Sequence, residues 1–175
     1  MKPIEARFSR PHNMSMAVVA AGMVLMAIVY LLSRPDQVPA FSLSDSRFLI
    51  NAMLGAAMTY YVWLGLTRYA NREPQVVIDR QGILVGFGRN RRLAWQDIDW
   101  IRLRRLGFRP QLQIGVKPEA FVAANLALSM WGLDDGLRPV RGTPAAFAVR
   151  DNGLDTRAAA MLDAVKSIRP NLIRS

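Results

Sequence analysis

The sequence predicts an α+β protein: a two-helix transmembrane hairpin, followed by an antiparallel β meander or barrel that a C-terminal amphipathic helix closes. Three observations predict this fold class. Two uncharged apolar blocks precede residue 67, short strands bounded by turn residues fill residues 75–116, and an apolar stripe at helical spacing runs close to the C-terminus.

The two apolar blocks have the length that a membrane requires. Met14–Leu32 and Phe48–Leu66 are each nineteen residues without a charge. At ~1.5 Å per residue each helix reaches about 28 Å, close to the roughly 30 Å of hydrocarbon in a bilayer. Tyr60 and Trp63 precede Arg68, which resembles an aromatic belt beside a basic anchor. We therefore assign transmembrane helices to residues 14–32 and 48–67.

Two other interpretations of these blocks are less consistent with the sequence. The first block could be a signal peptide, but it is too long for an ordinary apolar region and Ser33–Pro35 is a poor cleavage site. The second block could be the buried helix of a soluble core. Two blocks of equal, membrane-matched length around a short connector favour a pair of spans.

The distribution of basic residues predicts the orientation of the spans. Residues 1–13 carry three basic residues and one acid, and Arg68 and Arg72 follow the second span. The connector, residues 33–47, is neutral. By the positive-inside rule, residues 1–13 form a cytoplasmic tail, the connector lies on the outer side, and both termini are cytoplasmic.

Small residues on the second span predict a helix-packing face. They recur at i, i+3, i+4 and i+7, a spacing that lets helices approach closely, either within the hairpin or against another membrane protein. Neither span contains Asp, Glu, Lys, Arg or His, which argues against transport. The predicted face consists of Ala52, Gly55, Ala56 and Thr59.

The remaining chain, residues 73–172, is predicted to be the β domain. Its first strands are short and are separated by turn residues such as Gly82. We expect these strands at residues 75–79, 82–87, 92–95, 98–106 and 111–116.

A helix, a loop, a strand and a last helix complete the predicted domain. Pro118 followed by an acid opens a helix over residues 118–131, and residues 134–142 form a loop. A strand follows at residues 144–150. The helix at residues 156–169 is amphipathic. A curled meander closed by such a helix is the layout of a pleckstrin-homology-like (PH-like) domain.

A short motif resembles one particular family. Its residues come in the order of an apolar strand, an Asp-x-x-Gly turn, a second strand, a basic turn and Trp-x-Asp-Ile, and they are Asp79, Gly82, Trp95, Asp97 and Ile98.

This pattern resembles small bacterial inner-membrane proteins that have two N-terminal transmembrane helices and a cytoplasmic PH-like domain. The resemblance covers roughly residues 50–172. It implies a location in the bacterial inner membrane, with the connector in the periplasm, and it informs the fold more than the function. Within the motif we expect Trp95 and Ile98 in the core, and Asp97 as a turn cap that accepts backbone N–H bonds.

No recognisable catalytic pattern occurs in the sequence. Cysteine is absent, and the single histidine, His12, lies in the N-terminal tail. No zinc, phosphate-loop or nucleophile motif is present. We therefore expect a protein that is not an enzyme, with no cofactor and no metal.

Arginine is the remaining chemical signal in a chain of net charge +10. Basic residues near a membrane either form a solvated face or bind anionic headgroups and phosphates. No RNA-binding motif accompanies them, so no nucleic acid is expected. The candidate contact residues are Arg68, Arg72, Arg89, Arg91, Arg92, Arg102, Arg104, Arg105 and Arg109.

These features lead to two functional hypotheses. The first is a membrane-anchored interaction module whose PH-like domain docks a protein partner or an assembly subunit at the inner leaflet. The second is a domain that binds or senses anionic lipids through the arginines. Both place the chain in the membrane among lipids.

Overall fold

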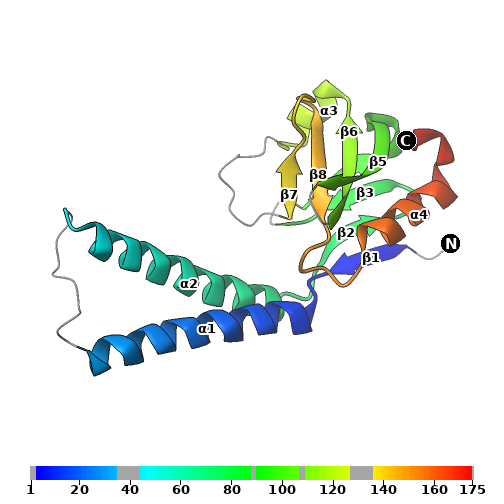
Figure 1. The fold of residues 1–175 in the computed structure, drawn as a ribbon. Coiled ribbons are helices and arrows are strands. Elements are labelled where there is room, and N and C mark those ends of the chain that lie inside the picture. Colours follow the sequence, from blue (N-terminus) through cyan, green and yellow to red (C-terminus); the bar gives the residue numbers. More distant parts are fainter. Residues whose placement is uncertain (1–2, 35–43, 88–89, 107–108, 127–135, 175) are drawn as a thin grey trace. The chain divides into compact units, whose positions relative to one another are not determined.

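Two long apolar helices, two antiparallel four-stranded sheets and two shorter α-helices make up the described structure (Figure 1). The helical unit runs from Ser9 to Arg72, and the β unit consists of the residues before and after it. Each unit is considered by itself. The structure is a computed structural model that describes residues 3–34, 44–87, 90–106, 109–126 and 136–174.

The helical unit consists of α1 (Arg10–Ser33) and α2 (Ser46–Ala70). Proline in the first turn of α1 and the Asp45 side chain, which accepts the Arg47 N–H at 2.9 Å, explain where the helices begin. Both helices are long and apolar enough to cross a membrane. Most of their large apolar side chains are exposed, which favours an apolar surrounding over a soluble core.

The two helices contact each other near the start of α1 and the end of α2. Asn13 and Ala17 of α1 and Leu64 and Gly65 of α2 are buried. A Cβ atom on Gly65 would lie 2.7 Å from the Asn13 carbonyl oxygen and 2.8 Å from the Ala17 Cβ. The backbones therefore approach each other here as closely as glycine permits.

The small-residue face predicted on the second span does not form this contact. Ala52, Gly55, Ala56 and Thr59 are exposed, and nothing lies within 4 Å of a Cβ on Gly55. At about 100° per residue, Leu64 lies half a turn away from Gly55 on the helix surface. The prediction that this face packs within the hairpin is therefore wrong, because α2 contacts α1 through Leu64 and Gly65 instead. Its contact with another membrane protein remains a prediction.

The predicted N-terminal tail contains a strand. β1 (Ile4–Arg7) pairs antiparallel with β2 (Pro74–Ile78), so that Ile4 faces Ile78 and Arg7 faces Pro74. Alternation along β1 buries Ala6 in the core of the β unit. The helical unit is therefore an insertion between two neighbouring strands of one sheet.

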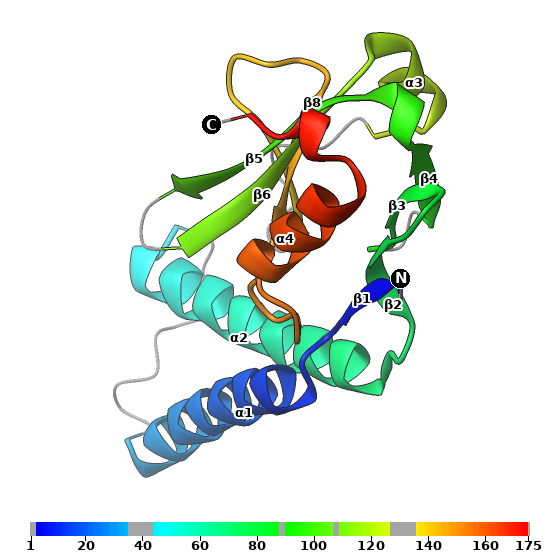
Figure 2. The same cartoon turned by 90° about the vertical axis from the view of Figure 1, so that its right-hand side faces the viewer.

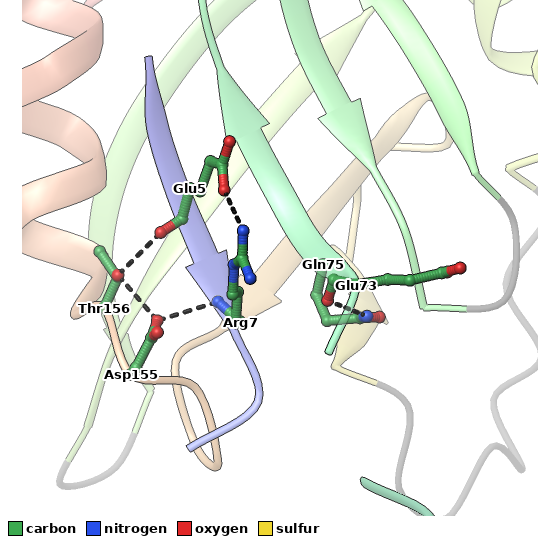
Figure 3. Close-up of polar contacts among 6 residues, drawn as sticks. All are labelled: Glu5, Arg7, Glu73, Gln75, Asp155 and Thr156. Carbon is green, nitrogen blue, oxygen red and sulfur yellow. Dashed lines mark hydrogen bonds and ion pairs between the residues drawn. The ribbon is translucent and has the colours of Figure 1, made fainter. Parts of the chain in front are cut away.

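The outer edge of β1 is also occupied (Figure 3). Its Arg7 N–H donates to the Asp155 carboxylate at 2.9 Å, and the Asp155 N–H donates to the Arg7 carbonyl at 2.9 Å. The Thr156 hydroxyl donates to the Glu5 carbonyl at 3.4 Å. β1 is thus held on both sides, by β2 and by the loop before the C-terminal helix.

The first sheet has the order β1-β2-β3-β4, with β3 at Gly82–Val85 and β4 at Arg91–Ala94. A 3-10 turn, Trp95–Asp97, leads to the second sheet. The second sheet has the order β5-β6-β8-β7 and consists of β5 (Ile98–Leu106), β6 (Arg109–Val116), β8 (Ala146–Arg150) and β7 (Leu137–Pro139).

The core of the β unit lies between the two sheets and the last helix, α4 (Ala158–Ile168). The helix packs against β5 and β6 of one sheet and β2 of the other (Figure 2). Its buried stripe includes Met161 and Val165, and the Asp151 carboxylate accepts the N–H of Ala158 at its start. One helix therefore closes both sheets over a shared core.

Several predicted elements have other limits. The helix expected at 118–131 is described as α3 (Pro118–Ala123), and its residues 127–131 lie outside the described part. β7 lies within the loop expected at 134–142. The third strand ends at Ala94, because the Trp95–Asp97 turn redirects the chain. β8 also pairs between β6 and β7, which a simple meander does not do.

Candidate functional site

The face of the second sheet turned away from the core is rich in arginine. Side chains alternate along a strand, so the burial of Ile101 in the core places Trp100, Arg102 and Arg104 of β5 on the outer face. Trp100 belongs to a separate small apolar cluster that includes Ala148 of β8. The outer face therefore combines apolar and basic side chains.

Backbone register aligns the basic residues of three strands. Gln111 of β6 lies directly between Arg104 of β5 and Arg150 of β8. Directly paired residues share a face of the sheet. Two strand spacings separate the two arginines, which is about 10 Å between their Cα atoms.

The next set of paired residues, two positions along the strands, shows the same arrangement and extends across four strands. Gln113 of β6 lies between Arg102 and Ala148, and Arg138 of β7 pairs with Ala148 on the far side. Each row therefore has arginine at its ends and an amide between them. The two rows together frame a basic area whose floor is glutamine and alanine.

This area is concave. It forms a pocket of about 620 Å³, here named the arginine groove. None of the described residues that line it is acidic, and its four arginines come from β5, β7, the segment after β7, and β8. The lining residues are Arg104, Gln111, Gln113, Arg138, Pro139, Val140, Arg141, Ala148 and Arg150.

One corner beside the groove is preorganised. The Arg102 guanidinium carbon lies 4.7 Å from the centre of the Trp100 ring, and its Nε–H donates to the Gln113 Oε1 at 2.8 Å. The indole lies against Gly115, where any Cβ would overlap it. Gly115 therefore provides the space for the Trp100 indole. The indole supports the Arg102 guanidinium, and the guanidinium orients the amide of Gln113.

The other side of the groove has cations available for a ligand. Arg104 and Arg141 are exposed and Arg150 is half-buried. Within the described part of the chain, none of the three forms an ion pair. Arg104, Arg141 and Arg150 therefore concentrate positive charge that no described residue neutralises through an ion pair.

Of the arginines selected from the sequence, the structure brings Arg102 and Arg104 to this face. Arg105 follows them on β5 and points to the opposite face by alternation. Arg91 and Arg92 lie on β4 in the other sheet, where Arg92 forms an ion pair of 2.6 Å with Asp79. These three do not contribute to the groove.

The remaining selected arginines lie elsewhere or outside the description. Arg68 is in the last turn of α2, and Arg72 lies between α2 and β2. Arg89 is outside the described residues, and so is the side chain of Arg109, whose backbone begins β6. The predicted arginine cluster is therefore divided among several places.

Sequence reasoning missed three groove residues: Arg138, Arg141 and Arg150. They lie 34 to 46 positions after Arg104 in the sequence. The available signal was Arg150 at the end of a strand with alternating small residues, because such a residue lies on the same face as Ala148. The pairing of that strand with β6 was needed to connect it to Arg104.

The motif residues Asp79, Gly82 and Trp95 come together as a structural joint. The Asp79 carboxylate accepts the backbone N–H of Gln81 at 2.8 Å and of Gly82 at 3.1 Å. Burial raises the pKa of Asp79, but the hydrogen bond and charge of Arg92 and the two N–H groups outweigh it, so that the pKa lies below its ordinary value.

Trp95 and Ile98 lie in the core of the β unit, while the turn cap expected at Asp97 is found at Asp79 instead. The 3-10 turn is closed by its own backbone, through the bond from the Ile98 N–H to the Trp95 carbonyl. The Asp97 carbonyl accepts the Lys117 N–H at 2.9 Å.

The described residues contain no group of three His, Cys, Asp or Glu side chains that could hold a metal ion. His12, in α1, is exposed. Comparison of the chain with protein-family models, with curated proteins and with solved structures gives no match.

Proposed function

We propose that the chain is a membrane-anchored, non-enzymatic interaction module of the bacterial inner membrane. In this proposal α1 and α2 span the bilayer as a hairpin, and the β unit is a PH-like domain on the cytoplasmic side. The domain docks a protein partner or an assembly subunit at the inner leaflet.

The observation that carries the proposal is the arginine groove. It is a concave, open surface of about 620 Å³ on a folded unit, with four arginines and no acid among its described lining residues. Arginine is enriched where proteins bind one another, because its planar fork combines stacking with bidentate hydrogen bonds. The groove has the chemistry of a binding surface.

The pairing of β1 with β2 supports the membrane arrangement. These strands flank the helical unit in the chain and lie side by side in one sheet. If both helices cross the bilayer, the two strands must end on the same side of it. Basic residues next to both helices then favour the cytoplasmic side.

The arrangement of the β unit is compatible with a PH-like domain. Two antiparallel sheets enclose the core, and α4 follows the last strand and packs against both sheets. The joint formed by Asp79, Gly82 and Trp95 uses the residues that carry the family resemblance. Such a fold supports many functions, so the argument for binding comes from the groove alone.

The docking proposal is tested by photo-crosslinking in living cells. A photoreactive amino acid at Arg141 should give one discrete protein adduct, whereas the same residue at Val122, on α3 and 76% exposed, should not. The double variant Arg104→Glu with Arg150→Glu should lose the adduct. Arg91→Glu, an exposed arginine in the other sheet, should keep it. An adduct that survives the double variant would contradict docking at the groove.

Binding of anionic lipids is the second candidate, and Arg104, Arg141 and Arg150, which form no ion pair with a described residue, favour it. Each Lys or Arg near an anionic leaflet gains about 1 kcal/mol. In the crosslinking experiment this function would give adducts of lipid mass and no protein adduct. The lipid adducts should also require Arg104 and Arg150.

The proposed topology has its own test. Reporter fusions after Ser44, between α1 and α2, should be active only in the periplasm, and fusions after Ser175 only in the cytoplasm. Fusions before Ile4 should behave like those after Ser175. The opposite pattern would place the β unit on the outer side and would end the proposal of docking at the inner leaflet.

A further inference from the structure

We propose that the arginine groove binds a phosphate group, held by Arg104, Arg150 and Arg141 above the amides of β6. This goes beyond the proposed docking of a protein and rests only on the groove being a binding site. The group enters as part of a soluble phosphate compound or of a phospholipid headgroup, and the chemistry of recognition is the same for both.

The register of the strands supports convergence on one group. Arg104 and Arg150 lie on either side of Gln111 in a single row across the sheet. Their Cα atoms are about 10 Å apart, so two long side chains can bend toward a ligand above Gln111 from opposite directions. Arg141 follows β7 and lines the same groove, which adds a third direction.

The charge of the groove favours phosphate over a single carboxylate. Three arginines without an ion pair to any described residue face a lining that has no acid among its described residues. A phosphate monoester carries up to two negative charges and three acceptor oxygens. A carboxylate has one charge and two oxygens, so it leaves two of the three guanidinium charges uncompensated, whereas the phosphate dianion leaves one.

The floor of the groove adds neutral donors. The oxygen of the Gln113 amide accepts the Arg102 Nε–H at 2.8 Å, which leaves the amide NH2 as the donor group. Arg102 is itself fixed against Trp100, at 4.7 Å from the ring centre. This corner is therefore oriented before a ligand arrives, which lowers the entropic cost of binding.

The shape argues for a group that enters the groove. Adsorption of a basic domain on an anionic bilayer needs only a flat, charged face. Here the charges line a concavity of about 620 Å³, which is in the range of small-ligand pockets, and Pro139, Val140 and Ala148 provide apolar surface. A phosphate attached to a small organic body fits this combination.

The test uses the full-length protein in a neutral detergent, titrated with inorganic phosphate at constant ionic strength. Phosphate should raise the melting temperature and give a saturable heat of binding, whereas sodium acetate should do neither. Arg104→Gln with Arg150→Gln should weaken phosphate binding by about tenfold or more, without changing the melting temperature of the unliganded protein. The Arg91→Gln control should bind as the unmodified chain does.

A second arm identifies the source of the phosphate. The protein is mixed with phosphatidylcholine vesicles that contain either a minority of phosphatidic acid or none. Binding that requires phosphatidic acid and is displaced by inorganic phosphate indicates a lipid headgroup. Binding of inorganic phosphate without any preference for phosphatidic acid indicates a soluble phosphate compound. Either result supports the inference.

Three results would overturn it: equal responses to phosphate and acetate, phosphate binding that survives the double variant, or groove-dependent binding of poly-glutamate without binding of phosphate. The last result would assign the groove to an acidic protein segment. In that case the inference fails while the docking proposal stands. The reverse outcome is also distinguishable: if the unmodified groove binds phosphate but gives no protein crosslink from Arg141, the docking proposal fails while the inference stands.

Discussion

The indole N–H of Trp95 donates a hydrogen bond of 3.0 Å to the backbone carbonyl of Asp79, across a separation of 16 residues. The same aspartate closes the β2–β3 turn through the N–H groups of Gln81 and Gly82. At Gly82, where φ is +151°, a Cβ would overlap the Leu93 carbonyl. The β2–β3 turn, strand β4 and the core residue Trp95 therefore contact one another at this point of the first sheet.

Truncation of Trp95 should destabilise the β unit strongly. Its side chain is 7% exposed and packs in the main core, so Trp95→Ala should lower the free energy of unfolding by about 3–5 kcal/mol. Trp95→Phe keeps most of the packing and loses the hydrogen bond to Asp79, at a cost of about 1–3 kcal/mol. Denaturant unfolding of the full-length protein measures both. A Trp95→Ala protein as stable as the unmodified chain would show that Trp95 is not a core residue.

Folding of the β unit should require β1. Because Arg7 and Pro74 face each other in the ladder, a short Gly/Ser linker can join residues 3–8 directly to residues 73–174 and replace the helical unit. This joined chain should fold, whereas residues 73–174 alone should show little cooperative unfolding, since the loss of β1 removes buried Ala6 and the hydrogen bonds to Asp155.

Thermal unfolding followed by circular dichroism compares the two chains. Within the joined chain, Ala6→Asp should prevent folding, and Glu5→Gln, at an exposed position, should have little effect. Equal stability of the chains with and without residues 3–8 would mean that β1 is dispensable.

The ion pair of Arg92 with Asp79 should make stability depend on pH. The pKa of Asp79 is lowered in the folded state, so its contribution is present above the unfolded pKa and is lost as the pH falls through the folded pKa. Arg92→Ala should therefore be less stable than the unmodified chain near neutral pH, and the difference should shrink in acid. Melting temperatures from about pH 7 to about pH 2 test this. Arg91→Ala should show no such pH-dependent difference.

The close approach of α1 and α2 should depend on Gly65. Gly65→Val would place atoms within 2.7 Å of the Asn13 carbonyl oxygen and 2.8 Å of the Ala17 Cβ, so it should destabilise the hairpin by about 1–3 kcal/mol. Gly55→Val introduces the same side chain into the same helix, where nothing lies within 4 Å. Unfolding of the detergent-solubilised protein should separate the two variants. If Gly55→Val were the more disruptive, the predicted small-residue face would be the true contact.

The sequence by itself determined the features that depend on neighbouring residues. Uncharged runs of membrane length gave the two helices, alternation and turn residues gave β5 and the β2–β3 hairpin, and the apolar stripe gave α4. Each is a local pattern of periodicity or capping, which needs no knowledge of the rest of the chain. The core position of Trp95 followed from the same kind of pattern.

Tertiary structure alone decided how distant segments meet. The four residues of β1 have too weak a pattern to indicate a strand, and they become one because β2 and Asp155 supply partners on both sides. Which side of α2 packs against α1 depends on where the helices cross, which moved the contact from Gly55 to Gly65.

The arginine groove shows the same limit at the candidate site. Local clustering of charge in the sequence selected Arg89 to Arg109, yet Arg138, Arg141 and Arg150 line the groove with Arg104. Strand pairing sets these neighbours, and pairing is governed by burial of the opposite face of the sheet. The sequence determined that the protein is rich in arginine, and the sheet determined which arginines act together.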